Sequence, residues 1–243
     1  MRNREYHNIK AIYNREMLTT FSSPMALIFF FVFAVTCGYF FTSPFFLVGQ
    51  SELRGLFSII PLLYLILVPA ITMNMVSRDW NLGTMEIMTT LPITDYEYII
   101  GKFMASVMLV ITSLFFTVVH VITVYRFGTE IDTGAIICGY FGLILLGAFY
   151  SSVGIFASSL FDNNVQALML SFGIVLIFFM MDKVLIFVPS ALLSSIMQYM
   201  SVDFHLSNIS RGVIDTRNII YFISMSALFL NLSVRALESR QWR

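Results

Sequence analysis

Residues 80–102 read WNLGTMEIMTTLPITDYEYIIGK, and they lie between two long apolar runs. The stretch is too polar to cross a lipid bilayer, whose core needs about 20 mostly apolar residues in a helix. Its glycine, proline and threonine residues fall where short helices begin and end. The sequence therefore predicts a bent, half-polar connection between two membrane spans, which we call the elbow (residues 77–97).

The first half of the elbow has the spacing of a short helix with one apolar face. The apolar residues at these steps are Leu82, Met85, Met88 and Leu91, with Ile87 beside them. We expect Thr84 to cap this helix and Glu86 to lie in its first turn, near the positive end. This helix should end at Leu91, because the residue before a proline, here Pro92, avoids the α region. Spacing alone leaves open a plain connector that lies on the membrane surface.

The second half of the elbow predicts the start of a membrane helix. Thr94 and Glu97 match a capping box directly before the next apolar run. Lys102 follows within that run, and we expect its ammonium group to reach the lipid headgroups.

Composition indicates a membrane protein. Of the 243 residues, 58% are hydrophobic and 12% are charged, whereas a soluble domain carries about 25% charged residues. The net charge is zero, so nothing indicates a nucleic-acid partner. Cys37 and Cys138 lie in apolar runs and match neither a metal signature nor a disulfide framework, so we expect two buried or lipid-facing thiols.

Six stretches are long and apolar enough to span a bilayer. They are Pro24–Phe41, Leu56–Val76, Tyr98–Val124, Gly134–Leu160, Val165–Val188 and Ile219–Leu237. Ser22 and Ser23 are candidate caps, with Pro24 at the first helical position, and Pro61 and Pro69 predict kinks in the second span. We therefore predict an all-α polytopic membrane protein with one domain, residues 1–243.

Six spans place both termini on one side. Five of the 14 Lys and Arg residues fall on the opposite side, and the other nine fall on the side of the termini. The five are Arg54, Arg126, Lys183, Arg211 and Arg217. The positive-inside rule then predicts cytoplasmic termini, a cytoplasmic elbow and an external helical segment at residues 189–217. The charged, amphipathic residues 1–22 show no cleavage-site pattern, so we expect the first span to remain as an anchor.

Residues 1–22, which we call the leader, have the pattern of an amphipathic helix lying in the membrane interface. Its predicted apolar face carries Tyr6, Ile9, Tyr13 and Met17. Arg4, Asn8 and Arg15 lie on the predicted opposite face. A simple membrane anchor explains this pattern without further function.

The sequence carries no motif for catalysis. G-x-x-x-x-G-K-[ST], H-E-x-x-H and G-x-S-x-G are absent, and three widely spaced histidines form no cluster. Asp182 and Lys183 interrupt the fifth span near its outer end, and as sequence neighbours they should not face each other. The fourth span carries small residues at steps that let another helix approach closely, and we expect that helix to belong to the same chain. They are Gly147, Ser151, Gly154 and Ser158.

The segment GTMEIMTTLPITDYEYIIGKF, residues 83–103, resembles the G-T-x-E-x-L-x-x-x-P-[ILV]-[ST] signature of ABC-2-type (type V-like) permeases, the membrane halves of ABC transporters. REMLTTFSSPMALIFF resembles that family's opening, and YFGLILLGAFYSSVGIFASSLFDNN resembles its fourth span and the turn that follows. RGVIDTRNIIYF, followed by ALESRQW, is similar to the ending of the gliding-associated GldF branch, near the NosY-like permeases.

This resemblance implies that the elbow is a coupling helix docked on a separate ABC ATPase. The implied contact residues are Arg78, Asp79, Trp80, Leu82, Gly83, Thr84, Met85, Glu86, Met88, Leu91 and Pro92. The leader would be the connecting helix that braces the elbow. Two ATPase copies would carry ATP and Mg, so this chain would hold no cofactor itself, and a second permease copy or a paralogue would complete the complex in a bacterial inner membrane. The family commonly has acids just before the elbow, and Arg78 replaces one of them.

Three functions follow as hypotheses. The first is an exporter half-permease that is not an enzyme by itself but belongs to an ATP-hydrolysing translocase. The second is a mechanotransmitter that drives an external partner through residues 189–217. Its candidate contacts or gate residues are Asp182, Lys183, Arg211, Asp215 and Arg217, for which a capped surface helix is the simpler explanation. The third is an ATP-independent channel or membrane scaffold.

Overall fold

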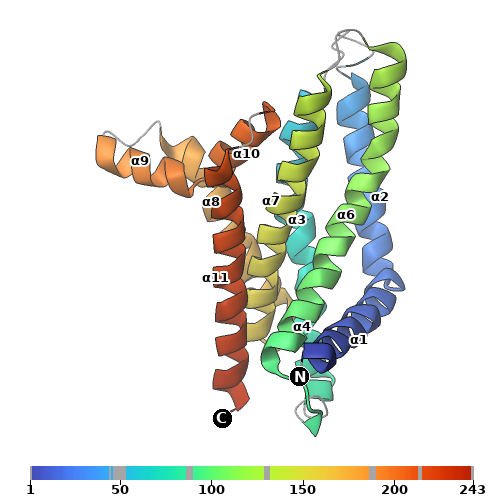
Figure 1. The fold of residues 1–243 in the computed structure, drawn as a ribbon, viewed down its shortest axis with the longest axis vertical. Coiled ribbons are helices and arrows are strands. Elements are labelled where there is room, and N and C mark those ends of the chain that lie inside the picture. Colours follow the sequence, from blue (N-terminus) through green and yellow to red (C-terminus); the bar gives the residue numbers. More distant parts are fainter. Residues whose placement is uncertain are drawn as a thin grey trace.

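The computed structural model describes residues 2–43, 45, 53–85, 90–128, 132–185, 190–212 and 215–241. Its named elements are all α-helices (Figure 1). They are α1 (Arg2–Phe21), α2 (Pro24–Thr42), α3 (Arg54–Thr72), α4 (Asn74–Asn81), α6 (Asp95–Phe127), α7 (Thr133–Leu160), α8 (Asn164–Val184), α9 (Ala191–Met200), α10 (Val202–Ser210) and α11 (Thr216–Gln241). Six candidate membrane spans lie in the described residues, which confirms the predicted all-α polytopic fold.

The second span is kinked, as predicted. Helix α3 ends at Thr72 and α4 begins at Asn74, and Met73 between them keeps a helical φ of −54° and ψ of −31°, so both helices belong to one candidate span. Pro69 lies inside α3, where it removes one helical hydrogen bond shortly before this kink. The fifth span was expected to reach Val188; α8 is described to Val184, and residues 186–189 lie outside the described residues.

Local sequence signals set the helix starts that were predicted. Ser23 caps α2, and its Oγ accepts a hydrogen bond from the Met25 N–H at 3.1 Å, with Pro24 at the start of the helix. Thr94 and Glu97 form the predicted capping box at the start of α6. These signals succeed because each bond joins residues only two or three positions apart.

Helix α7 is the centre of the bundle and packs against α3, α6, α8, α10 and α11. Its small residues face helices of the same chain, as predicted. A Cβ on Gly147 would lie 2.4 Å from Val110 Cγ1, and one on Gly154 would lie 1.8 Å from Thr72 Oγ1. Both cysteines are free and buried.

The two ends of the bundle differ. Both termini, α1 and α4 lie at one end, whereas α9 and α10 lie toward the other, with α9 crosswise to the long helices (Figure 1). This arrangement fits six spans with both termini on the same side. It separates the elbow from the segment that was predicted to be external.

The leader packs against the chain by a face that carries Ile12 and Glu16. Helix α1 lies against α6, and Ile12 and Glu16 are buried, whereas Tyr6 is 70% exposed. Gly101 in α6 permits this approach, because a Cβ there would lie 2.7 Å from Ile12 Cγ2. The face predicted to lie in the membrane interface stays a prediction, and the structure adds a protein-facing side on which Glu16 finds a partner.

Candidate functional site at the base of the elbow

The elbow is held between two helix ends. Its entry limb is α4, and its exit limb is the first turns of α6. Gly83 turns the chain after α4 with a φ of +67°, a left-handed conformation that glycine adopts without steric cost. Glu86 and Met88 lie outside the described residues.

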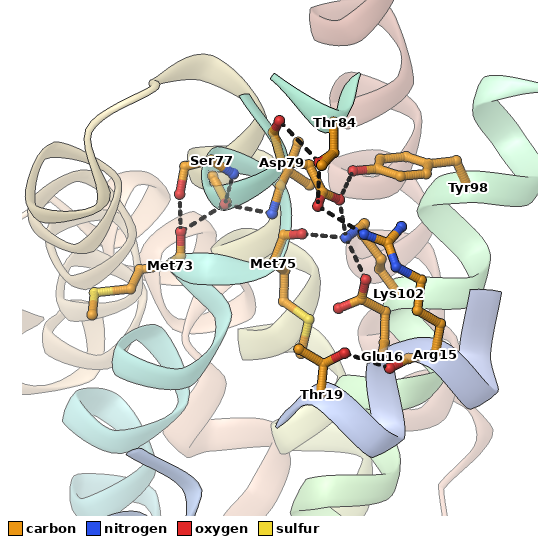
Figure 2. A network of polar contacts seen from close by, with 12 residues as sticks. Arg15, Glu16, Thr19, Met73, Met75, Ser77, Asp79, Thr84, Tyr98 and Lys102 are labelled. Atoms are coloured by element: carbon orange, nitrogen blue, oxygen red, sulfur yellow. Dashed lines mark hydrogen bonds and ion pairs between the residues drawn. The ribbon is translucent and has the colours of Figure 1, made fainter. Parts of the chain in front are cut away.

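Lys102 is the centre of a buried charge cluster at this base (Figure 2). Its side chain is 1% exposed, and its Nζ lies 2.8 Å from Glu16 Oε1 and 2.7 Å from Asp79 Oδ2. The same Nζ donates a hydrogen bond to the Met75 carbonyl oxygen. The expectation that Lys102 reaches the headgroups was wrong, because two carboxylates from other helices hold it inside.

Asp79 connects this cluster to both limbs of the elbow and to the leader. The Tyr98 hydroxyl donates to Asp79 Oδ2 at 2.6 Å, and Arg15 Nη2 donates to Oδ1 at 3.3 Å. Thr84 Oγ1 donates to the same Oδ1 at 3.1 Å, so it bonds back toward α4 (Figure 2). The N–H groups that Thr84 was predicted to cap belong to residues 86 and 87, outside the described residues. The Asp79 carboxylate therefore joins α1, α4, α6 and the turn after α4.

The cluster balances its charges, with two cations, Lys102 and Arg15, and two anions, Glu16 and Asp79. Removing one partner of a buried ion pair leaves an uncompensated charge and costs about 3–5 kcal/mol. The geometry therefore resists any separation of α1, α4 and α6. It makes the base of the elbow one rigid unit.

The leader also contacts the exit limb. Asn8 Nδ2 donates to Glu97 Oε2 at 3.1 Å and to the Pro92 carbonyl oxygen at 3.3 Å. Glu97 Oε2 simultaneously accepts the Thr94 N–H of the capping box at 2.9 Å. Helix α1 thus holds both limbs, the entry through Arg15 and the exit through Asn8.

A second set of contacts, with α11 and the turn between α7 and α8, holds the entry limb α4. Arg240, near the end of α11, lies 4.7 Å from the centre of the Trp80 ring, and its Nη2 lies 2.5 Å from Asp162 Oδ1. Asn81 Nδ2 donates to the Asp162 carbonyl oxygen at 2.6 Å. Trp80 is therefore half-buried under a cation of its own chain.

The tip of the elbow remains open to contact. Leu82 is 64% exposed and Leu91 is 44% exposed, and Gly83 and Pro92 are also exposed. Met85 and Asp79 are enclosed by the chain itself, at 3% and 2% exposed. Arg78 is half-buried and lines a small cavity beside Glu16. Among the described residues, the predicted contacts thus extend from an exposed tip, with Leu82 and Leu91, to a buried base, with Asp79 and Met85.

The residues proposed for external contacts lie at the other end. Lys183 Nζ lies 2.5 Å from Asp203 Oδ2 and 3.8 Å from Asp182 Oδ2, so the expectation that Asp182 and Lys183 do not pair was wrong. Arg211 is exposed and lines a cavity of about 290 Å³ between α3 and α10. Asp215 Oδ1 accepts the Arg217 N–H at 2.9 Å at the start of α11, which agrees with a capped surface helix.

Sequence reasoning missed the charge cluster because its members are far apart in the chain. Glu16 and Lys102 are 86 residues apart, and Asp79 and Lys102 are 23 apart. The one available signal was a lysine within an apolar span, which is costly in a membrane unless it is paired. That rule predicts a partner for Lys102 but does not identify it.

The chain matches the family model described as ABC-2 family transporter protein over residues 10–233, which is most of its length. No protein with a curated description matches it significantly.

Proposed function

The chain belongs to the ABC-2 family of transporter proteins and is a permease subunit of an ABC transporter; from this premise we propose that its elbow receives the ATPase subunit. ATP hydrolysis on that separate subunit would push the exposed tip, and the rigid base would pass the push to the spans. The observation that carries this proposal is the division of the elbow into an open tip and a base cross-linked by ion pairs.

The chemistry of the tip supports docking of another protein. Leu82 and Leu91 are large apolar side chains exposed at the end of the bundle where α1 and both termini lie. Such anchors contribute most when a partner pocket desolvates them. An ATPase groove that binds these two side chains would contact the end of α4 and the segment before α6 together, and could move both helices.

The complete assembly would contain two ATPase copies, which carry ATP and Mg, and a second permease copy or a paralogue. It would lie in a bacterial inner membrane, with the termini and the elbow in the cytoplasm, in accord with the distribution of Lys and Arg. Assignment to the gliding-associated branch rests on the segment RGVIDTRNIIYF. The direction of transport in this proposal is export.

A second function, transmission of force to an external partner, is favoured by the form of the outer end. Helix α9 projects crosswise there and carries no charged residue, and Leu192 is 80% exposed (Figure 1). Lys183 and Asp203 connect α8 to α10 beside it. A movement of the spans would therefore displace a surface suited to a partner.

Leu82→Asp tests the main proposal because it places a charge on the tip without touching the buried base. We expect the variant to insert normally but to lose co-purification with its ABC ATPase and stimulation of ATP turnover. Leu192→Asp is the matched control, since this leucine is exposed at the opposite end. Equal ATPase recovery and stimulation in wild type and Leu82→Asp would contradict docking at the tip.

A further inference from the structure

The second span is kinked where it approaches the elbow, and its regular helical hydrogen bonding breaks at Met73 although the φ and ψ of Met73 stay helical. Helix α3 ends at Thr72, and α4 begins at Asn74. The N–H groups of a helix's first turn have no carbonyl partner within the helix, so a break inside a packed protein needs donors and acceptors from elsewhere. Val76 and Ser77 lie just after this break and are fully buried.

Ser158 of α7 supplies the missing partners. Its Oγ accepts hydrogen bonds from the Val76 N–H at 3.0 Å and the Ser77 N–H at 2.9 Å. The same hydroxyl donates to the Met73 carbonyl oxygen at 2.8 Å. With one donated and two accepted bonds, its capacity is fully used. Ser158 therefore caps α4 as an N-cap residue would, but from a different helix.

The contact between the break and α7 continues one turn earlier. Gly154 lies four residues before Ser158, on the same face of α7. A Cβ at Gly154 would lie 1.8 Å from Thr72 Oγ1 and 2.6 Å from Thr72 Cβ, so the end of α3 rests directly on this glycine. The two parts of the kinked span thus meet α7 at adjacent turns.

Helix α4 is fixed at both ends. Its C-terminal part carries Asp79 of the charge cluster and Trp80 under Arg240, and its first turn is bonded to Ser158. Helix α7 packs against most of the other spans. Toward α3 and α7, a displacement of α4 is therefore carried by the backbone through Met73 into α3 and by the Ser158 hydroxyl into α7.

We propose that Ser158 is a positioning residue that couples α4 to α7, so that movement of the elbow is transmitted across the break to the central helix. This proposal rests on the proposed function, because it assumes that an ATPase moves the elbow. Without the hydroxyl, α4 would move relative to α7, and ATP hydrolysis would displace the outer end less.

The test uses the chain purified with its ABC ATPase, with spin labels at Tyr125→Cys and Leu192→Cys. Both native residues are exposed, on α6 and α9. Distances between the labels are measured with and without ATP, together with ATP turnover. For Ser158→Ala we expect turnover comparable to wild type but an ATP-driven population shift about 2- to 30-fold smaller, the range of coupling changes for single residues.

Ser159→Ala is the matched control. Ser159 is as fully buried as Ser158, but its hydroxyl donates only to the Phe156 carbonyl oxygen of its own helix, at 2.7 Å. We expect it to keep the wild-type shift. Should Ser158→Ala fail to assemble, Ser158→Cys gives the same comparison with little change in volume, because a thiol is a weak hydrogen-bonding group.

The outcomes separate the two proposals. A wild-type shift in Ser158→Ala, or an equal loss in Ser158→Ala and Ser159→Ala, would overturn the role of Ser158 and leave the ATPase docking proposal intact. A proportional loss of turnover and shift in Ser158→Ala alone would also overturn it, because that result indicates a purely structural role. Absence of any ATP-driven shift in wild type would contradict the proposed function itself.

Discussion

At the scale of single residues, Lys102 determines how the elbow is attached. It is a cation almost completely removed from solvent, and its partners come from α1 and α4. Buried ion pairs of this kind add little net stability compared with apolar replacements, but they strongly penalise the loss of one member. Lys102 therefore holds the leader and the entry limb in one fixed arrangement.

Replacing this lysine by methionine tests that arrangement. Lys102→Met keeps most of the side-chain volume but leaves Asp79 and Glu16 with only Arg15 as a cation. We expect the free energy of unfolding to fall by about 3–5 kcal/mol, measured by denaturation in detergent micelles. ATPase stimulation should fall with it, because the base of the elbow loosens.

Lys183→Met serves as the control because its ion pairs lie at the surface, where the lysine side chain is 52% exposed. Exposed pairs contribute about 0–1 kcal/mol, so this variant should unfold close to wild type. Equal effects of the two substitutions would refute the structural importance assigned to Lys102.

At the scale of elements, the sequence predicted what short-range chemistry determines. The caps at Ser23 and Thr94 were found because their bonds are local. The kink before α4 was predicted for the same reason, from Pro69, four residues before Met73. The buried face of α1 was not found, because it depends on partners in a distant helix. Amphipathic spacing cannot reveal which polar residue will meet an opposite charge after folding.

The packing of α1 on α6 gives a prediction at this scale. Gly101→Ala would place a methyl group 2.7 Å from Ile12 Cγ2 and 3.2 Å from the Ile9 carbonyl oxygen. Overpacking of this kind costs about 1–3 kcal/mol. We expect the amide hydrogens of α1 to exchange faster, as measured by hydrogen–deuterium exchange.

Gly38→Ala is the comparison for this effect, because a Cβ at Gly38 would meet nothing within 4 Å. It should leave exchange in α1 unchanged. Protection of α1 that is the same in Gly101→Ala as in wild type would show that the leader does not depend on this close approach.

At the scale of the whole molecule, composition and span length were sufficient to predict six membrane helices, and the structure confirms them. The resemblance in the elbow indicated the family, which the match over residues 10–233 shows. The predicted contact residues stay a prediction, because docking depends on a second protein. What the structure adds is the separation of the exposed Leu82 and Leu91 from the enclosed Asp79 and Met85.

At the same scale, the elbow and the segment predicted to be external lie at opposite ends of the molecule. The elbow and both termini lie at one end, and α9 and α10 lie toward the other (Figure 1). Between them, α7 contacts most of the long helices. Force applied at the tip would reach the outer end through α7.

Site-specific photo-crosslinking tests docking at the tip most directly. A photoreactive amino acid is placed at Leu82, with Leu192 at the opposite end as the reference position, in membranes that contain the ABC ATPase. The account predicts a cross-link to the ATPase from position 82 and none from position 192. No ATPase adduct at position 82, in membranes where the ATPase is bound, would contradict it.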